Sequence, residues 1–235
     1  MLRVTRYIKS VAKFLMIPFI GRLENKKRTF YFQGKKYYYF YNRHNYTFIN
    51  ERAIEIPIFS NIINKHQTSK ILEVGSTLWN YFHQQYDVVD KYDESPEIIR
   101  KDILRYHPKT KYDLIISIST LEHVGWDESL YGKSCKNNKN YFLKTLKHLQ
   151  SLLTDQGSII FSVPLGYNPY VDLYITKMHD YFDDLYFMQR SPIINRWKQI
   201  NRTKLRNFKH NYLLGYSNAI AIGVINKNNL LKKFF

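Results

Sequence analysis

"ILEVGSTLWNYF", residues 71–82, is the stretch that decides the fold of this 235-residue chain. Apolar and acidic residues lead into a single glycine, Gly75, as in the first strand and turn of a nucleotide-binding sheet. The later glycines of a dinucleotide fingerprint are absent, because Ser76, Thr77 and Leu78 stand in their places. The turn therefore predicts a ligand site at a strand end that is not built for a diphosphate.

Segments with strand character and helical character alternate on both sides of this turn. The predicted strands cover 70–74, 86–90, 112–119, 158–164, 184–191 and 218–226, and predicted helices follow Asn50 and cover 140–153. The alternation predicts an α/β fold with a doubly wound, mostly parallel, seven-stranded Rossmann-like sheet. No good crossover helix separates the last two strands, so we expect them to form an antiparallel C-terminal edge pair.

The chain is predicted to divide into an N-terminal extension, residues 1–49, and a domain that covers residues 50–235. The extension is basic and rich in tyrosine, and Gln33-Gly34 between two β-prone runs predicts a hairpin. Before it, residues 1–25 suggest an amphipathic helix whose apolar run is too short to span a bilayer. Peripheral membrane contact through this helix and packing on its own domain both remain open.

Charge and cysteine content restrict the function classes. The formal net charge is +17, and the basic residues gather at the two ends, including a basic insert at 191–216. Basic ends favour contact with nucleic acid, phospholipid or a phosphorylated substrate, although an AT-rich genome would enrich lysine in the same way. The single cysteine, Cys135, excludes an internal disulfide framework and fits a reducing, cytoplasmic location.

The carboxyl ends of the predicted parallel strands carry the informative side chains, because open sheets bind ligands there. Gly75 lets the main chain approach a ligand, and Asp90 can accept two hydrogen bonds from ribose hydroxyls. Asp102 can reach the exocyclic amine of adenine, with Ile103 packed on the ring. Each acid alone would be read as a cap or a solvated turn, but together they predict a ligand that contains adenosine.

These residues give residues 70–166 a resemblance to the core of class I S-adenosylmethionine-dependent methyltransferases. The matching pieces are "LEVGS", "VVD", "KDI", "YDLIISISTLEHV" and "LLTDQGSIIFSVP". The "LEHV" form resembles the branch that contains many small-molecule methyltransferases. The chain departs from the family pattern in its glycine turn, which keeps one glycine only.

The resemblance implies S-adenosyl-L-methionine as the cofactor. It also implies a role for each matching residue: Glu73 organises the loop at the methionine part, Gly75 and Ser76 lie against the cofactor, Asp90 holds the ribose, Asp102 and Ile103 frame the adenine, and Ser119 borders the reacting face. Methyl transfer needs no metal, and the sequence has no His, Cys or Asp spacing that predicts one.

Residues on the acceptor side are predicted from their position near the strand ends. Arg52 can meet a carboxylate or phosphate, Tyr167 and Asn168 stand at the pocket rim, and His123 is the candidate catalytic base. A surface cation, a turn and a loop-fixing histidine are the structural alternatives for these positions.

The main functional prediction is a methyltransferase for a small-molecule or glycan-type acceptor, with an anionic acceptor as one reading. The tyrosine-rich ribbon and the insert at 191–216 are expected to close over the pocket. An RNA methyltransferase that binds RNA through both basic ends is the first alternative. A catalytically silent subunit that docks a partner or a membrane is the second.

Overall fold

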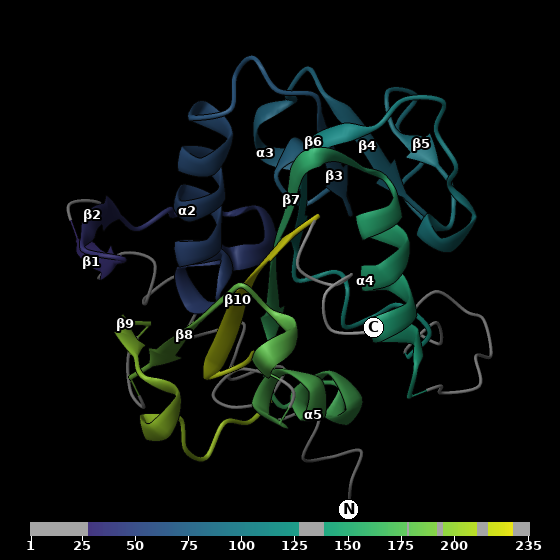
Figure 1. Cartoon of the computed structure of the whole chain (residues 1–235). Helices are drawn as coiled ribbons and strands as arrows, with labels where there is room; N and C mark the ends of the chain where they lie inside the picture. Colours follow the sequence, from purple (N-terminus) through teal and green to yellow (C-terminus); the bar gives the residue numbers. More distant parts are fainter. Residues whose placement is uncertain (1–27, 127–138, 178, 192–194, 211–215, 228–235) are drawn as a thin grey trace, which may run out of the picture.

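The computed structural model describes residues 28–126, 139–177, 179–191, 195–210 and 216–227 (Figure 1). The predicted helix within 1–25 and Cys135 lie outside these residues. One eight-stranded sheet forms the centre of the described part, in the order β5-β4-β3-β6-β7-β10-β8-β9. Its strands are β3 (Ile71–Val74), β4 (Asp87–Asp90), β5 (Ile99–Arg100), β6 (Tyr112–Ile118), β7 (Leu153–Pro164), β8 (Asp184–Arg190), β9 (Trp197–Ile200) and β10 (Ala219–Asn226).

The sheet confirms the predicted Rossmann-like fold. Strands β5, β4, β3, β6 and β7 are parallel neighbours, while β10 runs antiparallel to both β7 and β8. The predicted antiparallel pair is therefore present, but β10 lies inside the sheet. The strand at that edge is β9, which pairs with β8. Neither β9 nor the two-residue β5 falls in a predicted strand range, and the sheet has eight strands where seven were predicted.

Helices cover both faces of the sheet (Figure 1). The α-helices are α2 (Arg52–Asn64), α3 (Trp79–Phe82), α4 (Tyr141–Ser151) and α5 (Pro169–Lys177), and short 3-10 turns lie at His44–Ile49, Ile103–Arg105, His179–Tyr181 and Arg202–Lys204. On β6, Ile115 packs into the cluster that includes residues of α4, whereas Leu114 and Ile116 pack into the cluster that includes residues of α2. A strand that is buried on both faces needs apolar residues at successive positions, as its sequence has.

One predicted boundary differs from the structure. We expected "TDQG" to close the helix at 140–153, but α4 ends at Ser151 and these residues belong to β7. The reason is that Leu153 pairs with Tyr112, so β7 begins before the apolar run at 158–164 from which the strand was predicted.

The extension packs on the domain through its hairpin, β1 (Thr29–Phe32) and β2 (Lys35–Tyr38). Gln33 and Gly34 have φ of +49° and +71°, as a two-residue turn between twisted strands requires. Phe30 is 3% exposed and belongs to the same apolar cluster as helix α2. The hairpin is therefore part of the hydrophobic core rather than a loose ribbon.

A proline inside α2 provides a second link to the extension. Helix α2 continues through Pro57, which has no N–H to donate to the carbonyl of Ala53. The backbone N–H of Phe40 donates to that carbonyl instead, at 2.9 Å. The extension thus provides, through Phe40, the donor for the Ala53 carbonyl that Pro57 cannot supply.

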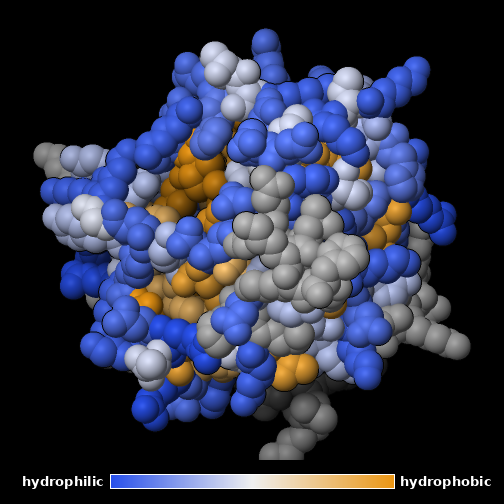
Figure 2. Space-filling view, in the orientation of Figure 1, coloured by the Kyte–Doolittle hydropathy of each residue, from blue (hydrophilic) through white to orange (hydrophobic). Residues whose placement is uncertain are grey.

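The surface in Figure 2 is mostly hydrophilic, with apolar residues in a recess over helix α2. Within the described ranges, no helix combines the length and apolar character needed to cross a bilayer.

Candidate active site

A pocket of about 270 Å³ opens at the carboxyl ends of β3, β4 and β6. Of the predicted site residues, its wall contains Arg52, Gly75, Ser76, Asp90, Asp102, Ile103, Ser119 and His123. Glu73, Tyr167 and Asn168 are not part of this wall. No residue in the described parts of 191–216 lines it either, since β9 continues the sheet instead of covering the pocket. The extension supplies Asn45.

The turn after β3 owes its glycine to a neighbouring side chain. Gly75 has φ of +83°, and its N–H donates to the carbonyl of Val89 at 2.9 Å. A Cβ added here would lie 2.2 Å from the Oγ1 atom of Thr120. Both the backbone conformation and the close approach of Thr120 therefore require glycine.

Glu73 organises this turn from inside the protein. Its carboxyl group is fully buried and accepts hydrogen bonds from the N–H groups of Leu78 at 2.6 Å and Trp79 at 3.1 Å, and from the Tyr86 hydroxyl at 2.9 Å. Burial raises the pKa of Glu73 to about 7 against the opposing effect of these hydrogen bonds. Glu73 thus shapes the pocket without lining it.

Asp90 is partly engaged by its own loop. Its Oδ1 accepts from the N–H groups of Tyr92 at 2.7 Å and Asp93 at 3.0 Å, and its Oδ2 accepts from the N–H of Ser76 at 3.2 Å. A carboxylate offers about four acceptor positions, so one remains on Oδ2. The geometry leaves room for one strong bond to a diol, where the sequence suggested two.

Asp102 and Ile103 lie together in the wall, close to the end of β4 that carries Asp90. Asp102 accepts from the N–H of Leu104 at 3.0 Å and forms an ion pair with Lys91 at 3.2 Å. Ile103 is 6% exposed and belongs to the core, yet it also reaches the pocket. An apolar side chain beside an acceptor that keeps a spare lone pair suits a flat heteroaromatic ring with an amino group.

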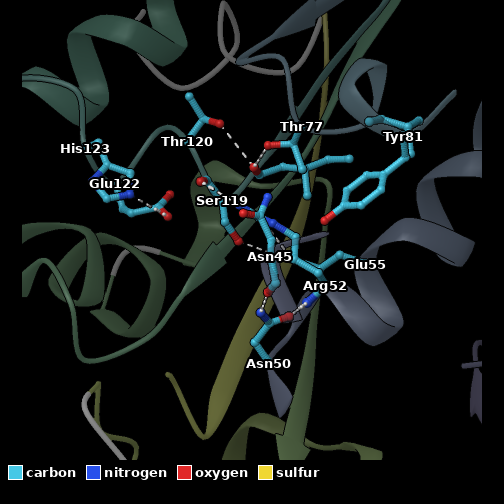
Figure 3. Close-up of polar contacts among 12 residues, drawn as sticks. Asn45, Asn50, Arg52, Glu55, Thr77, Tyr81, Ser119, Thr120, Glu122 and His123 are labelled. Carbon is cyan, nitrogen blue, oxygen red and sulfur yellow. Dashed lines mark hydrogen bonds and ion pairs between the residues drawn. The ribbon is translucent and has the colours of Figure 1, made fainter. Parts of the chain in front are cut away.

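The other end of the pocket is built where α2 begins and β6 ends (Figure 3). Arg52 forms an ion pair with Glu55 at 2.7 Å, and the Ser119 hydroxyl donates to the second oxygen of the same carboxylate at 2.6 Å. Ser119 has φ of +39°, a strained conformation for a residue with a Cβ. The contact with Glu55 weakens the sequence-based argument that Arg52 recognises an anion.

His123 stands in the wall with about a third of its side chain exposed. Its Nε2 lies 3.6 Å from an oxygen of Glu122, and its ring packs on Tyr167 with 4.8 Å between centroids. Tyr167 also packs on His210. Tyr167 is thus a support for His123 rather than a rim contact.

Asn168 has a structural task, contrary to our expectation of a rim residue. It is 4% exposed, donates from its amide to the carbonyl of Glu122 at 2.8 Å, and accepts from the N–H of Tyr170 at 3.0 Å. The second bond caps the start of α5. Its side chain therefore joins α5 to the segment after β6.

Three buried glutamates near the acceptor end, Glu51, Glu55 and Glu122, were not predicted as site residues. Burial, together with the neighbouring acids, raises the pKa of Glu51 to about 7 and that of Glu122 well above its usual range. The acid at Glu55 between two isoleucines, in a predicted apolar helix, was the only sequence signal. Within the described residues no group of His, Cys, Asp and Glu is arranged to hold a metal ion.

No family model and no curated protein matches the sequence. Similar solved structures include the N-methyltransferase NodS from Bradyrhizobium japonicum WM9 in complex with S-adenosyl-L-homocysteine. The sequence identity is 11%, the match covers 75% of this chain and 90% of that chain, and the TM-score is 0.39. A second is an S-adenosylmethionine-dependent methyltransferase from Clostridium acetobutylicum ATCC 824, at 11% identity, with 71% and 87% of the two chains covered and a TM-score of 0.37. Coclaurine N-methyltransferase has 13% identity, with 78% and 67% covered and a TM-score of 0.37. Similarities this distant carry no argument about the cofactor or the acceptor.

Proposed function

We propose that this protein transfers a methyl group from S-adenosylmethionine to a small-molecule acceptor. The observation that carries the proposal is the pocket itself, which brings Gly75, Asp90 and Asp102 together from three separate strand connections. Its volume is near the lower end of the range for small-molecule pockets, roughly 300–1,000 Å³. The acceptor position on Asp90 Oδ2 and the apolar Ile103 fit a ribose and an adenine.

In this proposal one end of the pocket binds the cofactor and the other end binds the acceptor. Asp90, Asp102 and Ile103 would hold the nucleoside, while the bound cofactor supplies an electrophilic methyl group on a sulfonium. Arg52, Ser119 and His123 then surround the space for the acceptor. In-line transfer depends mainly on alignment of the reacting atoms, and the buried contacts of Ser119 and Arg52 with Glu55 fix this wall rigidly. His123, about a third of whose side chain is exposed, can accept a proton from the acceptor.

Calorimetric titration of the full chain with S-adenosylhomocysteine tests the proposal. We expect micromolar binding, about −8 kcal/mol, and a loss of at least tenfold in an Asp90→Asn variant. Asp113→Asn is the matched control, because Asp113 also accepts a backbone N–H, that of Lys70 at 2.9 Å, but at the start of β6, away from the pocket. Thermal unfolding of each variant checks that it is folded.

The outcomes separate the proposal from its alternatives. Absence of binding by the folded wild type would reject the enzyme and favour the silent docking subunit. Binding that is equal in wild type and Asp90→Asn would place the cofactor elsewhere. RNA that is methylated and bound with a steep salt dependence would replace the small-molecule acceptor by RNA.

A further inference from the structure

Three buried carboxyl groups lie behind the acceptor end of the pocket, next to the wall residues Arg52, Ser119 and His123. Glu51 and Glu55 come from the start of α2, and Glu122 comes from the segment after β6; they are 8%, 0% and 1% exposed. Figure 3 shows the Glu122 carboxyl pointing toward the group formed by Ser119 and Arg52. These acids interact electrostatically with one another and with Arg52.

The cluster holds more negative than positive groups. Three glutamates are accompanied by Arg52 and by Arg190, whose Nη1 donates to the carbonyl of Ile49 at 2.7 Å. His123, at 3.6 Å from Glu122, adds a positive charge only when it is protonated. With all three glutamates ionised, one carboxylate would have no matching cation, so the cluster takes up protons instead.

Two oxygen atoms identify where this excess lies. Oε2 of Glu51 and Oε2 of Glu122 are buried and have no hydrogen-bond partner among the described residues. Native proteins rarely leave buried polar atoms unsatisfied, and such atoms call for a ligand or a proton. The raised pKa values of both residues indicate that protons fill this place near neutral pH.

We propose that the methyl acceptor is an amine, which enters as an ammonium ion and is held by the buried carboxyl groups of Glu51, Glu55 and Glu122. The inference rests on the proposed function. An ammonium brings the missing positive charge and several N–H donors for the two unsatisfied oxygens. A carboxylate or phosphate would find no unpaired positive charge here, because Glu55 already neutralises Arg52 at 2.7 Å.

The reaction balances with the groups at hand. The ammonium nitrogen has no lone pair, so it first gives one proton to His123 in the pocket wall, and the adjacent Glu122 stabilises the imidazolium. The freed lone pair forms the new nitrogen–carbon bond while the sulfur–carbon bond breaks, and its electron pair goes to sulfur. The methylated product is again an ammonium ion, and the proton on His123 passes to solvent.

Three cofactor analogues test the acceptor class without knowledge of the natural substrate. In each, nitrogen replaces the sulfur of S-adenosylhomocysteine and carries a two-carbon arm that ends in an ammonium, a hydroxyl or a carboxylate. Calorimetry on the full chain should show the ammonium arm binding at least tenfold more tightly than the hydroxyl arm, about 1.4 kcal/mol, and the carboxylate arm binding least.

Variants connect the preference to the cluster. Glu122→Gln should remove most of the advantage of the ammonium arm and leave the affinity for S-adenosylhomocysteine within twofold. Glu97→Gln, at an exposed position outside the pocket wall, should change neither affinity. Should Glu122→Gln fail to fold, wild-type titrations in buffers of different ionisation enthalpy provide a second measure, because the ammonium arm should release protons from the cluster and the hydroxyl arm should not.

The two proposals can fail separately. If S-adenosylhomocysteine binds but the hydroxyl or carboxylate arm equals the ammonium arm, the amine acceptor is wrong and the methyltransferase stands. A preference for ammonium that persists in folded Glu122→Gln, with no proton release, would also overturn it. If S-adenosylhomocysteine does not bind, the proposed function fails and this inference fails with it.

Discussion

Gly75→Ala tests whether the turn after β3 is fixed by the protein's own packing. The alanine would keep φ near +83°, which costs about 1–2 kcal/mol for a residue with a Cβ. Its Cβ would also meet Thr120 at 2.2 Å, and overpacking of this kind costs about 1–3 kcal/mol. We therefore expect the free energy of unfolding to fall by about 2–5 kcal/mol.

Gly34→Ala separates the two contributions. Gly34 has a similar φ of +71°, but no atom lies within 4 Å of the added Cβ. This control should cost only the backbone strain, about 1–2 kcal/mol. Adding Thr120→Gly to Gly75→Ala should recover the steric part and leave the strain.

Urea unfolding followed by tryptophan fluorescence measures all of these variants. The midpoint should move and the slope should stay constant if only the folded state changes. The reasoning is refuted if Gly75→Ala costs no more than Gly34→Ala, or if Thr120→Gly gives no recovery. Either result would mean that Gly75 serves the approach of a ligand rather than the contact with Thr120.

Two further predictions concern stability. The pKa values of Glu51 and Glu73 are raised from 4.5 to about 7, so the folded protein binds more protons than the unfolded chain between these values. The free energy of unfolding should therefore fall as pH rises from 4.5 through 7. Urea titrations across this window should show the fall, with Glu51→Gln reducing it; a flat profile in the wild type would contradict the burial argument. Phe30→Ala should cost about 3–5 kcal/mol because Phe30 is 3% exposed, whereas Tyr31→Ala, 60% exposed on the other face of the hairpin, should stay within about 0.5 kcal/mol. Equal effects would show that the hairpin is not part of the core.

The parallel half of the sheet was predictable because its signals are local. Strand β6 is apolar at successive positions, and the hairpin turn carries Gly34 where φ must be positive. Strand β9 was missed because Trp197–Ile200 is short and alternates little, and only pairing with β8 makes it a strand. The two strands form a hairpin with Arg190 opposite Trp197, but residues 191–196 between them contain no glycine and so lack the usual hairpin signal.

The pocket residues, too, could be predicted only where a local sequence signal marked them. Gly75, Asp90 and Asp102 could be placed because each follows a recognisable strand or stands at a fixed point in the connection. The role of Asn168 could not be predicted, because it caps α5, a helix that we did not predict from the sequence. Glu55 escaped notice because its partner Ser119 lies 64 residues away, and only the fold brings the two together.

The position of β10 has a consequence for the synthesis of the protein. This strand is the last of the sheet in sequence but lies between β7 and β8. The two parts of the sheet therefore cannot be joined until residues 219–226 have been synthesised. Until then, β7 and β8 each present an unpaired edge to other chains. Such late, long-range closure slows folding and exposes the nascent chain to aggregation. We expect chains cut before residue 219 to depend on chaperones, although every pocket-wall residue has already been made.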